Sequence, residues 1–354
     1  MIKVLIVDDS EIDRKLISYA LNKETGIEVV GTAENPYVAK DLIKLLKPDV
    51  ITLDLHMPRM DGLTFLAKIM ELNPYPVIIV SSYTPKNSSY ALKALRMGAL
   101  DTISKPGLEY DVKEFSKRLI QTVRVASTAR IQSPNINRTV NKVSTKVSNA
   151  GNKIIAIGSS TGGTRALEFL LNELPAGLPG IVIVQHLPES FTKSFADRLN
   201  KNSVLNISEA TDNVEIKPGS VHIAKGNKHM VVQKRGEKSY IRVTGGEKIH
   251  YHRPSVDVLF NSVAEEFGPM ATGVILTGMG SDGAKGLLKM REKGAYTIGQ
   301  DETSSVVYGM PKVAYELGAV SNQLPLEEIP DKIIEAVSSP KSSSLKTALS
   351  QDLN

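Results

Sequence analysis

A glycine-flanked serine is the first place in this sequence where residue types and spacing suggest catalysis. Residues 158–162 fit the pattern G-x-S-x-G, in which glycines permit a sharp turn and the serine hydroxyl stands clear of the backbone. An apolar run precedes this turn and a helical pattern follows it, which indicates a strand, a turn and a helix. Ser160 is therefore a candidate nucleophile, although such a loop can also merely join two elements or bind a phosphate.

A histidine and an aspartate follow two further apolar runs in the same half of the chain. His186 comes after residues 180–184, and Asp282 comes after residues 272–277. Parallel strands carry their carboxyl ends on one edge of a sheet, so both side chains are expected beside Ser160. They would serve as the general base and as the acid that orients it. We favour His186 because it lies at a strand end, over the competing histidines His56, His222, His229, His250 and His252.

Two backbone groups on the same edge are the expected oxyanion donors. The N–H groups of Thr161 and Met279 both follow sharp turns, where they can point at a developing negative charge. The chain order Ser, His, Asp differs from the Ser, Asp, His order of α/β-hydrolases, so a different hydrolase scaffold is predicted.

Carboxylates gather in a second place, at the ends of strands predicted near the N-terminus. Strands fit residues 2–7, 27–33, 50–54, 77–81 and 102–104, with helical patterns between them. Converging carboxylates repel unless a hard cation such as Mg²⁺ lies among them. Asp54 could then accept a phosphoryl group, with Lys105 and Ser81 contacting its oxygens. The residues at these strand ends are Asp8, Asp9, Asp54, Ser81 and Lys105.

Length and composition limit the remaining possibilities. The 354 residues suffice for two domains, and the absence of cysteine excludes disulfides and fits a reducing cytoplasm. No apolar run is long enough for a membrane span, and the first residues do not resemble a signal peptide. The net charge of +5 arises mainly between residues 112 and 153, so we expect a basic helix and tether rather than direct binding of nucleic acid.

We predict an α/β protein with two doubly wound units. The domains are residues 1–126, a flavodoxin-like (βα)5 receiver, and residues 153–338, a mostly parallel sheet with an antiparallel hairpin at its edge. Residues 127–152 are predicted to be a linker and residues 339–354 a disordered tail.

The N-terminal motifs resemble those of response-regulator receiver domains. The resemblance rests on the acidic pair Asp8-Asp9, on Asp54, on Ser81 and on Lys105-Pro106. It implies phosphorylation of Asp54 by a histidine kinase, with Mg²⁺ held by Asp9, Asp54 and the His56 backbone carbonyl, and Asp8 beside them. Thr102 departs from the pattern, because many receivers carry a large aromatic residue there.

The C-terminal motifs, behind a receiver and a tether, resemble the CheB family of chemotaxis protein-glutamate methylesterases. They are residues 158–163, 185–188 and 277–284. The resemblance implies hydrolysis of glutamate γ-methyl esters on chemoreceptors with release of methanol, and in some members deamidation of receptor glutamines. It assigns the triad to Ser160, His186 and Asp282, and it implies no cofactor in the catalytic domain.

A different function remains open at this point. Residues 278–283 also fit G-x-G-x-x-G, with Asp301 about twenty residues further on, as in a dinucleotide-binding fingerprint. Asp282 opposes this interpretation, because its carboxylate would lie where the pyrophosphate must bind. The alternative is a phosphorylation-controlled dinucleotide-binding or regulatory module.

Overall fold

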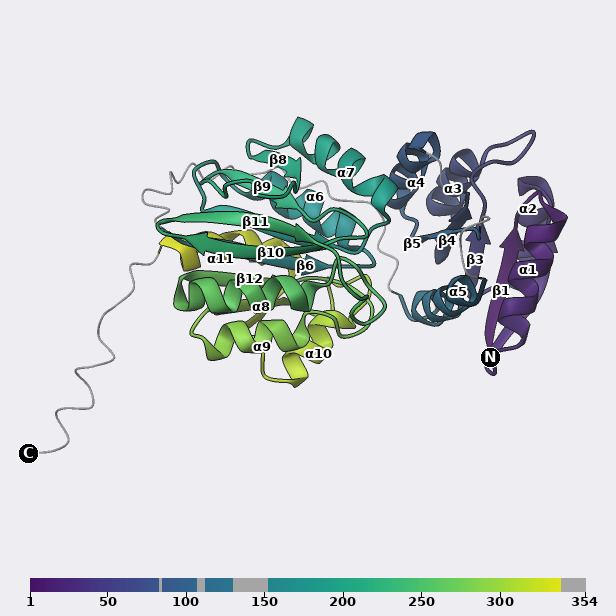
Figure 1. The fold of residues 1–354 in the computed structure, drawn as a ribbon. Coiled ribbons are helices and arrows are strands. Elements are labelled where there is room, and N and C mark those ends of the chain that lie inside the picture. The colour runs from purple at the N-terminus through teal and green to yellow at the C-terminus, as the bar shows by residue number, and fades with distance from the viewer. Residues whose placement is uncertain (83–84, 107–111, 130–151, 339–354) are drawn as a thin grey trace, which may run out of the picture.

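The computed structural model describes residues 1–82, 85–106, 112–129 and 152–338, with the backbone alone for residues 85–88. Most of the predicted linker, 127–152, and all of the predicted tail, 339–354, lie outside these residues. The described residues form two α/β units that lie side by side (Figure 1). Within those ranges, no helix has both the length and the apolar character that crossing a bilayer requires.

The N-terminal unit is a five-stranded parallel sheet with helices on both faces. Its strand order is β2-β1-β3-β4-β5, so the order reverses at β1 and opens a crevice at the carboxyl ends of β1 and β3. Alternate residues of β1 pack into two cores, one with α1 and α5 and one with α2, α3 and α4. The predicted βα repeats are confirmed. They are β1 Ile2–Val7, α1 Glu11–Asn22, β2 Ile27–Ala33, α2 Pro36–Leu46, β3 Val50–Leu53, α3 Gly62–Leu72, β4 Val77–Ser81, α4 Pro85–Met97, β5 Asp101–Ser104 and α5 Val112–Ala126.

The C-terminal unit is a larger doubly wound sheet. Its strands run parallel in the order β14-β13-β12-β6-β7-β9-β8. The central strand β6 is buried along its whole length, because helices cover it from both sides. The strands are β6 Ile154–Ser159, β7 Gly180–Gln185, β8 Asn206–Glu209, β9 Ser220–Ile223, β12 Ala271–Ile275, β13 Tyr296–Gln300 and β14 Asn322–Leu324. The helices are α6 Gly163–Glu173, α7 Glu189–Asn202, α8 Val256–Phe267, α9 Ala284–Glu292, α10 Met310–Glu316 and α11 Ile329–Ser338, with 3-10 turns η1 Gly268–Met270 and η2 Leu326–Glu328.

The predicted antiparallel hairpin exists, but its predicted place at the edge of the sheet is wrong. β10 His229–Arg235 and β11 Lys238–Thr244 form a separate two-stranded sheet. The edges of the large sheet are β8 and β14. The hairpin instead buries Met230 and Val232 against α8, and the Val232 amide donates to Ser262 Oγ at 3.0 Å. Apolar burial on a helix therefore decides its position, rather than strand pairing.

The two units meet at the carboxyl ends of the C-terminal strands. α4 packs against α6 and α7, and Arg96 Nε lies 3.6 Å from Glu168 Oε2. Thr161 Oγ1 donates to Asp101 Oδ2 at 3.5 Å. In Figure 1 the strand β6 ends toward the N-terminal unit, and α5 lies on the side of that unit nearest to this end. The receiver-like unit therefore lies over the edge on which Ser160 was predicted to stand.

Candidate active site

Ser160 lies in the turn between β6 and α6. Gly162 has φ 79°, a left-handed conformation that favours glycine, and the Gly163 amide donates to the Ser160 carbonyl oxygen at 2.7 Å. A Cβ atom at Gly163 would lie 2.2 Å from Gln185 Oε1. The turn therefore requires both glycines, and it leaves Ser160 nearly buried, 9% exposed, at the N-terminus of α6.

His186 is the first residue after β7, the strand that pairs with β6. Ser159 pairs with Gln185 in the parallel register, and the His186 amide donates to the Ser159 carbonyl oxygen at 3.1 Å. Ser160 and His186 therefore leave adjacent strand ends. The ring Nε2 lies 2.9 Å from Asp282 Oδ2, whereas the buried Nδ1 has no hydrogen-bond partner among the described residues. Nδ1 is thus the ring nitrogen that is open to a further partner, and among the described residues no hydrogen bond joins it to Ser160 Oγ. Catalytic contacts often tighten only when substrate binds.

Asp282 is buried at the N-terminus of α8. Its Oδ1 accepts from the Ser255 hydroxyl at 2.8 Å and from the Asp257 amide at 3.0 Å. Its Oδ2 accepts from the Val256 amide at 2.8 Å, in addition to His186. Burial alone would raise the pKa of Asp282, but the hydrogen bond and charge of His186 and these backbone amides outweigh it and hold that pKa below its usual range. Asp282 therefore stays anionic beside the imidazole.

The same contacts argue against the dinucleotide alternative. The helix that follows the loop 278–283 is α9, whose Gly286 amide already donates to Asp257 Oδ1 at 2.7 Å, and the Asp282 carboxylate lies in the loop itself, where it would repel a phosphate. Asp301, the expected ribose ligand, accepts from the Ser304 amide at 2.9 Å and from its hydroxyl at 2.6 Å. Asp301 is thus engaged within its own turn, and nothing at this loop supports nucleotide binding.

The two predicted oxyanion donors stand on turns that are bonded to each other. The Ser160 amide donates to the Thr277 carbonyl oxygen at 3.0 Å, and Thr277 Oγ1 donates to the Thr161 carbonyl oxygen at 3.0 Å. The N–H groups of Thr161 and Met279 donate to no backbone acceptor within the described part of the chain. Free donors on two adjoining turns beside a serine are what an oxyanion hole requires.

His252 is a close neighbour of the site that sequence reasoning missed. Its ring stacks on that of His186, with centroids 3.9 Å apart and an interplanar angle of 8°. Burial, together with the adjacent charge of His186, lowers the pKa of His252, so this ring stays neutral. The sequence offered His252 only as one of several histidines competing with His186, and only the fold brings its loop over the end of β7. The one hint in the sequence is that His252 lies shortly before α8, the helix whose first amides donate to Asp282.

The N-terminal unit brings its predicted polar residues together at the crevice of its sheet. Ligand oxygens of Asp8, Asp9 and Asp54 lie within 4.8 Å of one another. Lys105 Nζ lies 2.7 Å from Asp8 Oδ2 and 3.5 Å from Asp54 Oδ1. Burial raises the pKa of Asp8 to about 6, although Lys105 opposes that effect. The Ser81 hydroxyl is buried and has no hydrogen-bond partner among the described residues, so it is available to a further acceptor.

Two other residues predicted in this unit lie close to that cluster or below it. The His56 amide donates to Asp54 Oδ2 at 3.3 Å, so the His56 peptide lies beside the predicted phosphoryl acceptor. Thr102 is buried within β5, and its carbonyl oxygen accepts from Arg118 Nη2 at 3.1 Å. Arg118 belongs to α5, so it contacts β5 of the receiver-like sheet and also lines the cavity that faces the C-terminal unit.

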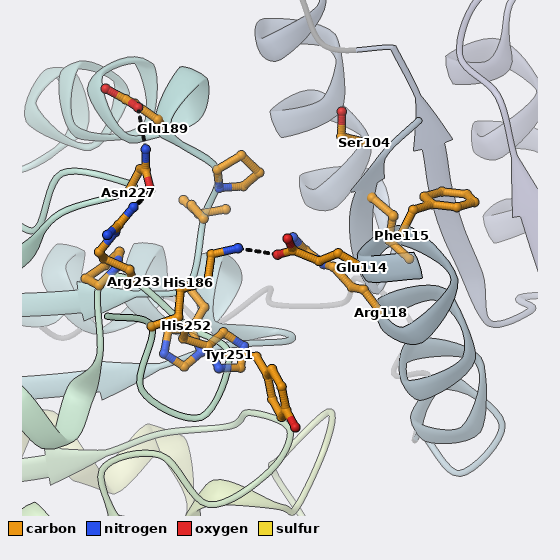
Figure 2. A pocket seen from close by; sticks show the side chains of 15 residues that line it. Ser104, Glu114, Phe115, Arg118, His186, Glu189, Asn227, Tyr251, His252 and Arg253 are labelled. Atoms are coloured by element: carbon orange, nitrogen blue, oxygen red, sulfur yellow. Dashed lines mark hydrogen bonds and ion pairs between the residues drawn. The ribbon is translucent and has the colours of Figure 1, made fainter. Parts of the chain in front are cut away.

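A cavity of about 210 Å³ separates α5 from the candidate catalytic residues. Figure 2 shows His186 and His252 on one wall, with Glu114 and Arg118 of α5 facing them. Lys117 Nζ lies 3.8 Å from the centroid of the Tyr251 ring, which is next to His252. The candidate site is therefore partly covered by the N-terminal unit.

The fold and the two sites define a class, a response regulator whose receiver is joined to an α/β hydrolase-like effector. Comparison with known proteins agrees: residues 4–116 match the response regulator receiver domain, and residues 155–333 match CheB methylesterase. This chain belongs to the CheB methylesterase family.

Individual relatives span nearly the whole chain. Protein-glutamate methylesterase/protein-glutamine glutaminase 2 of Syntrophus aciditrophicus (strain SB) is 49% identical over 340 residues, which cover 95% of this chain and 99% of the relative. The protein-glutamate methylesterase/protein-glutamine glutaminase of Salmonella typhimurium is 46% identical over 341 residues, covering 95% and 97%. The crystal structure of the Thermotoga maritima CheB methylesterase catalytic domain matches 52% of this chain and 98% of its own, with 43% identity and a TM-score of 0.51.

Proposed function

We propose that this protein is a phosphorylation-controlled serine hydrolase that removes methyl groups from glutamate γ-methyl esters of chemoreceptors and thereby serves chemotactic adaptation. The observation that carries this proposal is the 2.9 Å contact between His186 Nε2 and the buried Asp282 carboxylate, with His186 at the strand end next to that of Ser160. Membership of the CheB methylesterase family and the names of the relatives supply the substrate class.

The proposed reaction begins with the attack of Ser160 Oγ on the ester carbonyl carbon while His186 Nδ1 takes the hydroxyl proton. The carbonyl oxygen becomes an oxyanion, which the N–H groups of Thr161 and Met279 stabilise. Asp282 stabilises the imidazolium that forms. The tetrahedral intermediate collapses, the methoxy group leaves with the proton from His186 as methanol, and a glutamyl ester of Ser160 remains.

Water completes the cycle in a second half-reaction, in which water is the nucleophile and Ser160 Oγ is the leaving group. His186 takes a proton from water as its oxygen attacks the acyl-enzyme, and Ser160 Oγ leaves with that proton. The product is a glutamate carboxylate. A glutamine side chain would follow the same path with ammonia as the leaving group, in keeping with the glutaminase activity that the relatives' names carry.

In the receiver, Asp54 would accept a phosphoryl group from a partner histidine kinase. The proximity of the three carboxylates supports a magnesium site formed by Asp8, Asp9 and Asp54 with the His56 backbone carbonyl. Bound there, Mg²⁺ would neutralise the charge of the phosphoryl oxygens. Lys105 and the unpartnered hydroxyl of Ser81 would contact the same oxygens. No cofactor is proposed for the catalytic domain.

Phosphorylation would control access to the active site. In the arrangement described, α5 faces His186 across a small cavity, so a bulky substrate has no approach from that side. If phosphorylation favours the separated arrangement by about 1.4 kcal/mol, the ratio of open to closed molecules rises about tenfold.

The proposed domains are the receiver, 1–126, and the catalytic domain, 153–338, joined by the linker 127–152 and followed by the tail 339–354. The absence of cysteine fits a cytoplasmic location, and neither nucleic acid nor membrane insertion is required for this function.

Incubation of the full chain with methylated chemoreceptors tests the proposal. We expect methanol release that increases several-fold when acetyl phosphate and Mg²⁺ are added. Receptor methylation that stays unchanged under both conditions, with acetyl phosphate shown to phosphorylate the receiver, would exclude this function.

A further inference from the structure

The catalytic wall of the cavity carries positive charge that its own unit does not neutralise. Among the described residues, Lys248 forms an ion pair only with Glu114, which belongs to α5 of the receiver. Arg253 binds neutral groups, the side chain of Asn227 at 3.1 Å and the Gly246 carbonyl oxygen. Glu189 lies on the same wall but is paired with Lys225 Nζ at 3.4 Å. When the receiver moves away, Lys248 and Arg253 are left without a carboxylate.

The receiver presents a glutamate to this wall from a helix. Glu114 lies in the first turn of α5, and Figure 2 shows its side chain reaching across the cavity to the lysine of the opposite wall. Lys248, Glu114 and His186 all line this single cavity. The space beside the catalytic imidazole thus accepts a helix whose glutamate side chain projects into it.

The methyl ester of the proposed reaction is neutral, so the triad itself cannot distinguish an acidic substrate segment from a basic one. Exposed cations beside the reacting group can make that distinction, since they attract a carboxylate close to the ester and repel a cation. The side chains of Lys248 and Glu114 are 43% and 52% exposed. Such a partly solvated pair contributes modestly, so a substrate carboxylate in its place should change the Michaelis constant by about fivefold at most.

We propose that Lys248, with Arg253 beside it, is a substrate-positioning subsite for a carboxylate that neighbours the ester on an acidic helical segment. Glu114 occupies this subsite when the receiver is docked, so α5 covers the active site as an imitation of the substrate. This inference rests on the proposed methylesterase function. It adds that one lysine both binds the receiver and selects the substrate.

The two partners of the ion pair should therefore behave differently when each is changed in the full chain. Without acetyl phosphate, Glu114→Gln and Lys248→Met both raise methanol release, because each breaks the same docking contact. With acetyl phosphate, Glu114→Gln leaves KM and kcat unchanged. Lys248→Met raises KM for methylated receptor about fivefold and leaves kcat unchanged.

Lys225→Met is the matched control, because Lys225 is a partly exposed lysine that pairs within its own unit, with Glu189 of the cavity wall. Its KM should equal that of the unmodified chain at every salt concentration. The KM of the unmodified chain should rise with added NaCl, whereas that of Lys248→Met should change much less. If Lys248→Met and Glu114→Gln have the same KM with acetyl phosphate, Lys248 is only a docking contact and the subsite is excluded.

Labelling of Ser160 by a small neutral fluorophosphonate separates failure of this inference from failure of the proposed function. Equal labelling rates in the unmodified chain and in Lys248→Met show an intact nucleophile, so a KM difference then belongs to substrate binding. If neither chain releases methanol from receptors, the proposed function fails. If both release it with the same KM, only the subsite is refuted.

Discussion

Replacement of Asp282 by asparagine should nearly abolish hydrolysis. The hydrogen bonds of this carboxylate allow the free-energy loss to be estimated. Each carboxylate oxygen accepts two hydrogen bonds, from the Ser255 hydroxyl and the Asp257 amide on one side and from the Val256 amide and His186 on the other. Asparagine keeps the size but replaces one oxygen by an NH₂ group, so in either orientation two donors lose their acceptor. At about 1.5–3 kcal/mol for a hydrogen bond to a charged group, the loss is about 3–6 kcal/mol.

Part of that loss falls on the transition state, where His186 becomes an imidazolium that needs the anion. Loss of the equivalent aspartate in serine hydrolase triads lowers kcat by about 10⁴-fold, which corresponds to about 5.5 kcal/mol. We therefore expect kcat of Asp282→Asn to fall by about 10³- to 10⁴-fold, measured as methanol release in the presence of acetyl phosphate. The rest of the lost hydrogen-bond free energy should lower the stability of the fold, measured as a lower urea midpoint.

Asp257→Asn is the matched control for this experiment. Asp257 is a second buried acid at the start of α8, where it accepts from the Gly286 amide at 2.7 Å, and it forms no hydrogen bond to His186 in the described structure. Its replacement should lower the urea midpoint but leave kcat within about tenfold of the unmodified value. The reasoning is refuted if Asp282→Asn and Asp257→Asn lose the same stability and both retain kcat.

Three other predictions follow from the same contacts. Asp54→Asn should leave basal methanol release unchanged and remove its stimulation by acetyl phosphate; stimulation that persists would exclude control through Asp54. His252→Gln should lower kcat by about tenfold with little change in KM, because the ring that stacks on His186 at 3.9 Å is lost; an equal kcat would make the stack irrelevant to catalysis. Burial lowers the pKa of His222 to about 4, so between pH 6.5 and 4 the unfolded chain binds a proton that the folded chain does not. The stability contribution of neutral His222 is therefore complete above pH 6.5 and declines toward pH 4, by about 2 kcal/mol at pH 5. Urea unfolding of His222→Gln should show a smaller loss between pH 7.5 and pH 5 than the unmodified chain.

The residues at the strand ends were predictable from the sequence, because functional side chains of parallel βα units lie where an apolar strand stops. An apolar run that stops at Asp8, Asp54, Ser160 or His186 places that residue at the carboxyl edge of a sheet whatever the length of the helices between. The sequence also predicted that Asp282 opposes nucleotide binding. It did not predict which helix the carboxylate would contact, since the α8 amides reach it only through the packing of α8 against α9.

The surroundings of the site could not be read from the sequence, because they depend on contacts between distant segments. His252 belongs to a loop without periodicity, and the stack on His186 exists only because that loop crosses the end of β7. The hairpin β10–β11 has the pattern of a sheet edge, yet its apolar face packs on α8. The pairing of Lys248 with Glu114 joins exposed residues of two units, and neither residue has a sequence signal of its own.

Methanol release by Ser160→Ala in the presence of acetyl phosphate tests whether Ser160 is the nucleophile. This variant should accept a phosphoryl group on Asp54 as the unmodified chain does and unfold at the same urea midpoint, but release no methanol above the uncatalysed rate. Methanol release by Ser160→Ala at a rate close to that of the unmodified chain would contradict the assignment of Ser160 as the nucleophile.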